Sequence, residues 1–417
     1  ELLMASYAMA HLQLDLLLKQ TGFKATKTQR TKIYLTNSLE KYHPDTGTLF
    51  AKWLSSEANE ANYIKRHTPV MCIIGNPPYS GESANKGKWI MDLMQDYKKE
   101  PGGKEKLKER NPKFINDDYV KFLRYGQHFI EKNGSGVLAF INPHGFLDNP
   151  TFRGMRWNLL KTYDKIYTID LHGNSNIKET CPDGSPDINV FDIQQGVSIT
   201  IFVKTGKKKS NNLGKVFHYD LFGKRDDKYA FLSSNSLKTI PYTELSLKAP
   251  MFYMVPRDYQ TEEEYNKGFL LNELFIKSTI GVQTHRDDLV IDIDKSHLIK
   301  RFKDIFSNDD KPSLISKYNI KESNHWKLNN VIEKEKTFNE NELRKITYRP
   351  FDEREIYYNE SFVDRTRRSV GSELNKDNLV LHLAKIVKSE WNHTLVTKSI
   401  PTAISMDING TYFTPLY

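Results

Sequence analysis

The sequence predicts an α/β protein, with a mostly parallel, doubly wound sheet first and a separate α+β domain behind it. Up to about residue 235, short apolar runs alternate with amphipathic stretches of helical period. One apolar run, at residues 70–74, is stopped abruptly by Gly75 and two prolines. After residue 235 the helix and strand signals become short and charges are scattered. We therefore expect two domains, residues 1–235 and residues 236–417.

In the first domain we expect an apolar helix over residues 1–19, packed on a sheet, and a short strand over residues 32–35. Residues 80–118 are rich in Gly, Lys and Glu and predict a long polar loop. The loop has two open interpretations, a contact with phosphates or a solvated insertion.

The remaining segments continue the alternation and close it with a hairpin at one sheet edge. They are helices at residues 119–130 and 152–163, strands at 136–142 and 165–171, and hairpin strands at 196–204 and 215–221.

The composition is that of a soluble globular protein. The net charge of +9 permits a nucleic-acid partner. Two cysteines, Cys72 and Cys181, exclude a disulfide framework and a cysteine-based zinc site, so the expected location is the cytoplasm. The chain starts at Glu1, directly before an apolar helical segment, and we expect it to be a piece of a longer polypeptide, truncated inside its first domain.

The segment Asn76-Pro77-Pro78-Tyr79 carries the clearest chemical signal. It follows a buried strand, at the sheet edge where open α/β sheets hold their active sites. The prolines fix the backbone, so carbonyl groups nearby become rigid acceptors, and Asn76 adds a side-chain acceptor. Two acceptors and the Tyr79 ring suit a planar group that carries an NH2. A nucleobase held in this way must leave the double helix, because its amine is otherwise paired.

Asn-Pro-Pro-Tyr resembles the signature of amino-methyltransferases that use S-adenosylmethionine, above all the N6-adenine DNA methyltransferases. This resemblance implies a class I, Rossmann-like methyltransferase sheet followed by a target-recognition domain. It assigns catalysis to Asn76, Pro77, Pro78 and Tyr79. In this interpretation Asn76 and the carbonyl of Pro77 accept the amine hydrogens, while Tyr79 stacks on the base.

The same resemblance supplies further site residues. Glu1 matches the acidic residue that holds the cofactor's ribose, and Asn37 matches the position that contacts the cofactor's adenine. The segment Asn189-Val190-Phe191-Asp192 resembles the part of the family that sandwiches the flipped base, so Phe191 is the expected wall opposite Tyr79. A frayed terminus, a polar turn and an ordinary buried aromatic are the respective alternatives.

One family motif is absent. No glycine-rich cofactor loop of the form Asp-Pro-Ala-x-Gly-x-Gly occurs in the 417 residues. We expect the opening strand and its loop to lie upstream of Glu1, so this piece alone should bind S-adenosylmethionine poorly.

A longer resemblance, to large single-chain restriction-modification enzymes, runs through segments such as NVFDIQQGVSITIFVK, GVQTHRD and YRPFDER. It implies fusion to upstream nuclease and possibly helicase parts, with double-stranded DNA as partner. The C-terminal part would read DNA through phosphate or guanine contacts. The candidate side chains are Arg349, Arg354, Arg365, Arg367 and Arg368.

Other chemistry is disfavoured. Cys181 lacks the context of a covalent cytosine mechanism, and Cys72 is expected to be an inert core residue. His144, Asp170 and His172 do not show a metal-ligand spacing, so no metal is expected.

We therefore predict an adenine-specific DNA methyltransferase within a restriction-modification enzyme. A catalytically inactive DNA-binding specificity fragment is the alternative from a different class. A protein-glutamine N-methyltransferase is disfavoured, because more than 330 residues follow Tyr79.

Overall fold

A computed structural model describes residues 3–24, 31–41, 52–81, 83–109, 112–209, 211–375, 377–384, 394–406 and 410–416. It divides into two compact units, an N-terminal unit ending at Asp258 and a C-terminal unit beginning at Tyr259. Each is described by itself.

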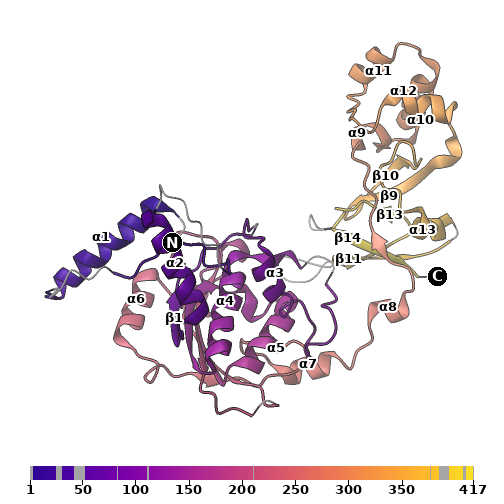
Figure 1. The fold of residues 1–417 in the computed structure, drawn as a ribbon. Helices are drawn as coiled ribbons and strands as arrows, with labels where there is room; N and C mark the ends of the chain where they lie inside the picture. Colours follow the sequence, from indigo (N-terminus) through magenta and orange to yellow (C-terminus); the bar gives the residue numbers. More distant parts are fainter. Residues whose placement is uncertain are drawn as a thin grey trace. The chain divides into compact units, whose positions relative to one another are not determined.

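The N-terminal unit is built on one sheet flanked by helices (Figure 1). Its helices are α1 (Met4–Gln20), α2 (Lys52–His67), α3 (Lys88–Met94), η1 (Lys113–Asn116), α4 (Asp118–Asn133), η2 (His144–Leu147), η3 (Pro150–Phe152), α5 (Arg153–Thr162), η4 (Ser175–Ile177) and α6 (Arg225–Ser234). Its strands are β1 (Cys72–Gly75), β2 (Gly136–Pro143), β3 (Lys165–Asp170), β4 (Val197–Lys204), β5 (Lys215–Asp220) and β6 (Thr243–Glu244).

The sheet has the strand order β1-β2-β4-β3-β5-β6. The pairs β1–β2 and β3–β5 are parallel, whereas β4 is antiparallel to both of its neighbours, β2 and β3. The expectations of a mostly parallel sheet and of a hairpin between residues 196–204 and 215–221 are therefore both wrong. Instead β4 enters the sheet between β2 and β3, where both of its faces are covered, and β5 lies beyond β3.

Alternation along the strands sends side chains to two different cores. Leu138 and Phe140 of β2 face a large cluster that includes Ile90 of α3 and Leu123 of α4. Ile141, one residue later, faces a smaller cluster that also contains side chains of α6. The sheet is thus covered by α3, α4 and α5 on one face and by α6 on the other.

The division between the units lies some twenty residues beyond the boundary expected at residue 235. The intervening segment adds β6 to the sheet edge beside β5. Met254 is fully buried, and its backbone N–H donates to Leu147 O at 2.8 Å. Arg156 Nε donates to Met251 O at 2.9 Å. These contacts attach the segment after residue 235 to the N-terminal unit, although its sequence predicts a polar linker.

Two sequence expectations for the start of the chain need correction. The helix at residues 1–19 forms as α1, but it does not pack on the sheet through its apolar side: Leu12 and Leu17 are 51% and 55% exposed. Residues 32–35 form no strand. They run beside α2, where Leu35 N donates to Glu57 Oε1 at 3.1 Å.

The region after the Asn-Pro-Pro-Tyr segment is more ordered than a solvated loop. Ile90, Met94 and Tyr97 are fully buried in the large cluster, so α3 belongs to the core. Cys72, expected in the core, is exposed, because β1 is the edge strand and residue 72 faces away from the cluster.

The C-terminal unit combines two antiparallel-rich sheets with short helices (Figure 1). The helices are α7 (Tyr259–Tyr265), α8 (Leu271–Leu274), α9 (Asp287–Val290), α10 (Lys295–Ser307), α11 (Lys311–Lys317), α12 (Leu328–Glu335), η5 (Glu340–Glu342), α13 (Arg368–Gly371) and η6 (Ser372–Asn375). The strands are β7 (Thr279–Ile280), β8 (Ile291–Asp292), β9 (Leu343–Arg349), β10 (Asp352–Tyr357), β11 (Val380–Ala384), β12 (Thr394–Thr397), β13 (Ile400–Pro401) and β14 (Thr411–Pro415).

The two sheets have the orders β13-β9-β10-β8 and β12-β11-β14-β7. Helix α10 packs on β8 and β10 through the buried side chains of Leu298 and Phe302. Phe302 in turn contacts Tyr357 and Phe362, with ring centroids 4.2 and 5.1 Å away. One aromatic cluster thus joins the helices to the first sheet.

A buried histidine should make the C-terminal unit sensitive to acid. His382, in the centre of β11, has no exposed surface, and burial lowers its pKa to about 4. The pKa of His382 in the folded protein lies below its unfolded value of about 6.5. The stabilisation that comes from neutral His382 is therefore complete above about pH 6.5 and is lost as the pH falls toward 4. We expect the protection of β11 amides from hydrogen exchange to fall by about 2 kcal/mol between pH 7 and pH 5.

His382→Gln should flatten this pH dependence, since glutamine does not titrate there. His297→Gln, at a histidine whose side chain is 70% exposed, is the control. An unchanged pH dependence in the His382 variant would assign the effect to other groups.

Candidate functional site

Asn76 to Tyr79 lie directly after the C-terminal end of β1, as the sequence predicts. Because β1 is parallel to β2, with Gly75 opposite Phe140, this segment lies beside the end of β2. Asn76 and Pro78 are exposed, Pro77 is buried and Tyr79 is half-buried. The buried proline anchors the turn, and its neighbours face outward.

The side chains of Asn76 and Tyr79 are coupled. Tyr79 OH lies 3.0 Å from Asn76 Oδ1 and 3.1 Å from Ile141 O, and its single proton serves one of them at a time. Burial raises the pKa of Tyr79 to about 12, so it is a neutral donor. Asn76 Oδ1 has two lone pairs and retains one for an incoming N–H. The hydroxyl therefore orients this acceptor without consuming it.

The chain after Tyr79 is tied to the start of α4. Ser80 N donates to Asp117 Oδ1 at 3.0 Å, and Asn85 Nδ2 donates to Asp118 Oδ1 at 3.0 Å. Lys121 Nζ adds a contact to Asn85 O at 2.5 Å. A rigid helix terminus thus fixes the segment that leaves the candidate site.

Phe191 lies in the bent segment before β4, not in a strand, and is half-buried. Its backbone N–H donates to Asn189 Oδ1 at 2.8 Å, while Asn189 Nδ2 donates to Gly173 O and Gln195 O. Phe191 and Tyr79 both pack against the smaller hydrophobic cluster. Tyr79 also packs against the large cluster on the other face, so it lies at the end of the sheet, and the two predicted walls share one of the two clusters.

The predicted cofactor residues have different outcomes. Glu1 lies outside the described residues. Asn37 lies in a turn, where its Nδ2 donates to Glu40 Oε1 and Asn85 Oδ1 and its Oδ1 accepts from Leu39 N. Both amide hydrogens are thus used within the protein, and one lone pair of Oδ1 is left to receive an amine.

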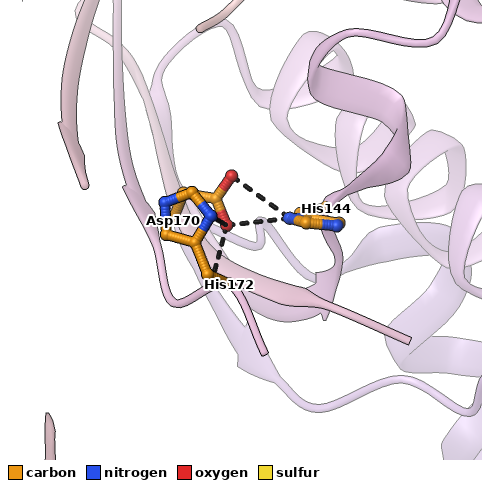
Figure 2. Close-up of side chains that lie close together, drawn as sticks. All are labelled: His144, Asp170 and His172. Atoms are coloured by element: carbon orange, nitrogen blue, oxygen red, sulfur yellow. Dashed lines mark hydrogen bonds and ion pairs between the residues drawn. The ribbon is translucent and has the colours of Figure 1, made fainter. Parts of the chain in front are cut away.

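A cluster of ionisable side chains that the sequence spacing had dismissed lies at the ends of β2 and β3 (Figure 2). His144 follows β2, whereas Asp170 ends β3 and His172 follows two residues later. His144 Nδ1 is 2.9 Å from Asp170 Oδ1, which also accepts from His172 N at 3.0 Å. Their ligand atoms lie within 4.8 Å of one another, a proximity that their spacing along the sequence did not predict.

His172 is held between two further carboxylates. Its Nδ1 is 2.8 Å from Glu179 Oε1 and its Nε2 is 2.9 Å from Asp220 Oδ1. Burial alone lowers the pKa of His172, but the bonds to Asp220 and Glu179 outweigh it and raise the pKa to about 10. The cluster lines a cavity of about 620 Å³ that also reaches Arg257. The sequence offered one signal, the position of these residues: His144, Asp170, His172 and Asp220 stand at or just after a strand end, whereas Glu179 does not.

The first two predicted DNA-contacting arginines share one aromatic ring. Arg349 and Arg354 both lie over Tyr348, with guanidinium carbons 4.3 and 3.9 Å from its centroid. Arg354 also makes a forked ion pair with Asp352. Since that pair occupies its donors, Arg349 is the better placed of the two for an external ligand.

The other three follow one another in the chain but differ in surroundings. Arg368 pairs with Glu342 at 2.9 Å. Arg365 is 58% exposed, and its backbone exchanges hydrogen bonds with Gln283. Arg367 has a positive φ of 59°, and its buried Nε has no hydrogen-bond partner within the described part of the chain.

The comparison with family descriptions gives two matches that follow one another along the chain. Residues 4–177 match the Eco57I restriction-modification methylase family, and residues 273–417 match the Type ISP C-terminal specificity domain. The N-terminal part thus matches a restriction-modification methylase domain and the C-terminal part a specificity domain. No curated protein matches this chain. Among the described residues, no helix has the length and apolarity needed to cross a membrane.

Solved structures share the fold of this chain. The ATP-dependent Type ISP restriction-modification enzyme LlaBIII bound to DNA has a TM-score of 0.64 at 21% identity, and the DrdV–DNA complex has 0.63 at 22%. A nuclease-deletion mutant of the Type ISP enzyme LlaGI with a DNA substrate mimic has 0.64 at 19%. Each match covers 100% of this chain but only 29%, 42% and 35% of the respective relative. The methylase and specificity parts thus span well under half of these enzymes.

Proposed function

We propose that this chain, as part of its whole protein, methylates DNA, transferring a methyl group from S-adenosylmethionine to the N6 amine of an adenine that has left the double helix. The observation that carries the proposal is the coupled pair Asn76–Tyr79 at the end of β1, with a second carbonyl acceptor expected at Pro77. The methylase match over residues 4–177 supports the reaction class. The carboxyl-end position supports a class I methyltransferase sheet.

The proposed reaction depends on how accurately the amine is positioned, more than on a reactive protein side chain. When bound, S-adenosylmethionine supplies an activated methyl group. The chain's own task is to hold the amine in line with it. Asn76 Oδ1 and Pro77 O would accept the two amine hydrogens and stabilise the positive charge that develops on nitrogen. Tyr79 and Phe191 would hold the base between them.

The C-terminal unit would read the DNA sequence. The specificity-domain match supports this role. Among the described contacts, Arg349 and Arg367 form no ion pair, whereas Arg365 Nε lies 3.6 Å from Asp364 Oδ2. We expect phosphate contacts to supply most of the affinity and base contacts the selectivity. For the whole protein, we propose fusion to nuclease and helicase parts, since the chain spans a minor share of its structural relatives.

The test is a transfer assay with tritiated S-adenosylmethionine and mixed-sequence duplex DNA, using the protein with all of its fused parts. Digestion to nucleosides should place the label in N6-methyladenine. Label in protein would replace the proposal with a glutamine methyltransferase. DNA binding without any transfer would leave a specificity module only.

A further inference from the structure

The cluster around His144 and His172 has the composition of a metal site. It brings two imidazoles and two carboxylates, Asp170 and Glu179, to one side of the cavity. The four side chains are poorly exposed, at 15%, 11%, 6% and 15% for His144, His172, Asp170 and Glu179. Mixed nitrogen and oxygen ligands of this kind suit zinc and neighbouring transition metals.

Ligand atoms of His144, Asp170 and His172 all lie within 4.8 Å of one another, and Glu179 Oε1 lies 2.8 Å from His172 Nδ1. Metal bonds near 2.1 Å place adjacent ligand atoms of a tetrahedral site roughly 3.4 Å apart. The observed separations fall on both sides of that value: His144 Nδ1 to Asp170 Oδ1 is 2.9 Å, Asp170 Oδ1 to His172 Nδ1 is 3.9 Å, and His172 Nδ1 to Glu179 Oε1 is 2.8 Å. Side-chain rotations, above all of Glu179, would have to bring the four atoms around one ion.

The hydrogen-bond partners of Nε2 leave Nδ1 of each histidine as the metal-binding atom. A metal-binding histidine usually donates its second ring N–H to a carboxylate or amide oxygen. His172 Nε2 has such a partner, Asp220, which also accepts from His218. His144 Nε2 lies 3.3 Å from Asn174 Nδ2, and the buried Asn174 Oδ1 has no partner in the described residues. Exchanging the amide O and N of Asn174, which are easily interchanged, gives His144 Nε2–H its acceptor.

Charge and backbone conformation add weight. Asp170 and Glu179 are poorly exposed and converge on the two histidines, so their charge needs a cation close by, which is either the protonated His172 or a metal ion that replaces its Nδ1 proton. His172 itself has a positive φ of 50°, which is unfavourable for a side chain with a Cβ. Strained positions of this kind persist where the surroundings fix them, often at ligand sites.

We propose that His144 Nδ1, Asp170, His172 Nδ1 and Glu179 bind one divalent transition-metal ion, with zinc as the best fit. Asp220 and Asn174 orient the two imidazoles. The ion would join the ends of β2 and β3 to the turn that carries Glu179. Gly173, next to His172, accepts from Asn189, whose Oδ1 holds the backbone of Phe191. The site would therefore stiffen one wall of the proposed base pocket without taking part in methyl transfer.

The first test is the metal content of the protein, purified without a histidine tag or chelator and measured by inductively coupled plasma mass spectrometry. We expect about one zinc ion per chain, and a lower melting temperature after treatment with a strong chelator that zinc alone restores. Cobalt substitution should give visible absorption bands of a low-symmetry site.

Variants separate this site from adventitious binding. His144→Ala and Glu179→Gln should each lose most of the metal, whereas His297→Ala, at an exposed histidine of the other unit, should retain it. Circular dichroism checks that each variant is folded. Metal-free wild-type protein that neither binds added zinc tightly nor gains stability from it would overturn the proposal. Equal zinc in the wild type and the His144 variant would do the same. None of these readouts depends on methyl transfer.

Discussion

Asn76→Ala is expected to lower the rate of methyl transfer by about 100- to 1,000-fold while leaving DNA affinity nearly unchanged. The loss follows from geometry, because Asn76 Oδ1 is the side-chain acceptor at the end of β1 and Tyr79 OH holds it at 3.0 Å. Phosphate contacts dominate affinity for DNA, and Asn76 is not expected to make one. Single-turnover transfer and an equilibrium binding titration measure the two quantities separately.

Three further variants serve as a control and as comparisons for Asn76→Ala. Asn133→Ala removes an asparagine at the C-terminal end of α4, just before β2 begins. This position lies at the opposite end of the strands from Asn76, so the rate of this variant should match the wild type. Tyr79→Phe keeps the ring but loses the hydroxyl that orients Asn76, so its rate should fall less than that of Tyr79→Ala. A rate for Asn76→Ala within a few-fold of the wild type would remove Asn76 from the proposed mechanism. A parallel loss of DNA affinity would point to a binding role.

Lys228→Met is expected to destabilise the N-terminal unit by about 3–5 kcal/mol. Lys228 Nζ lies 2.8 Å from Asp187 Oδ1, and neither side chain has any exposed surface. Asp187 also accepts from Gly173 N and Gly223 N, so it binds three separate segments together. Removing the ammonium leaves a buried carboxylate without its counter-charge. Urea unfolding measures the change, which is a large share of a typical domain's stability.

The control for Lys228→Met is Lys224→Met, one helical turn earlier at an exposed position, where we expect less than about 0.5 kcal/mol. The double variant Lys228→Met with Asp187→Leu should recover part of the loss, because it removes the stranded charge as well. Equal stability of the Lys228 and Lys224 variants would show that the buried pair contributes little.

Local signals in the sequence were sufficient for the secondary structure around the site. The apolar run before Asn76, the amphipathic period of α4 and the helix at residues 152–163 need only neighbouring residues, and each forms close to its expected bounds. The strand-then-proline pattern also located the Asn-Pro-Pro-Tyr turn at the end of β1. These features depend on periodicity and backbone restriction, which a single sequence displays directly.

Features that depend on which segments meet were decided only in the tertiary structure. Strand β4 pairs with β2 and β3 instead of β5, because strand order follows from burial of both faces and not from proximity in the chain. Asp187 binds Lys228 forty-one residues later, a pair that neighbouring residues in the sequence do not predict. His144, Asp170 and His172 have no ligand spacing along the chain, but strands β2 and β3 bring them together at one edge of the sheet. Sequence therefore determined the local elements and the chemistry of one turn, and packing determined the clusters.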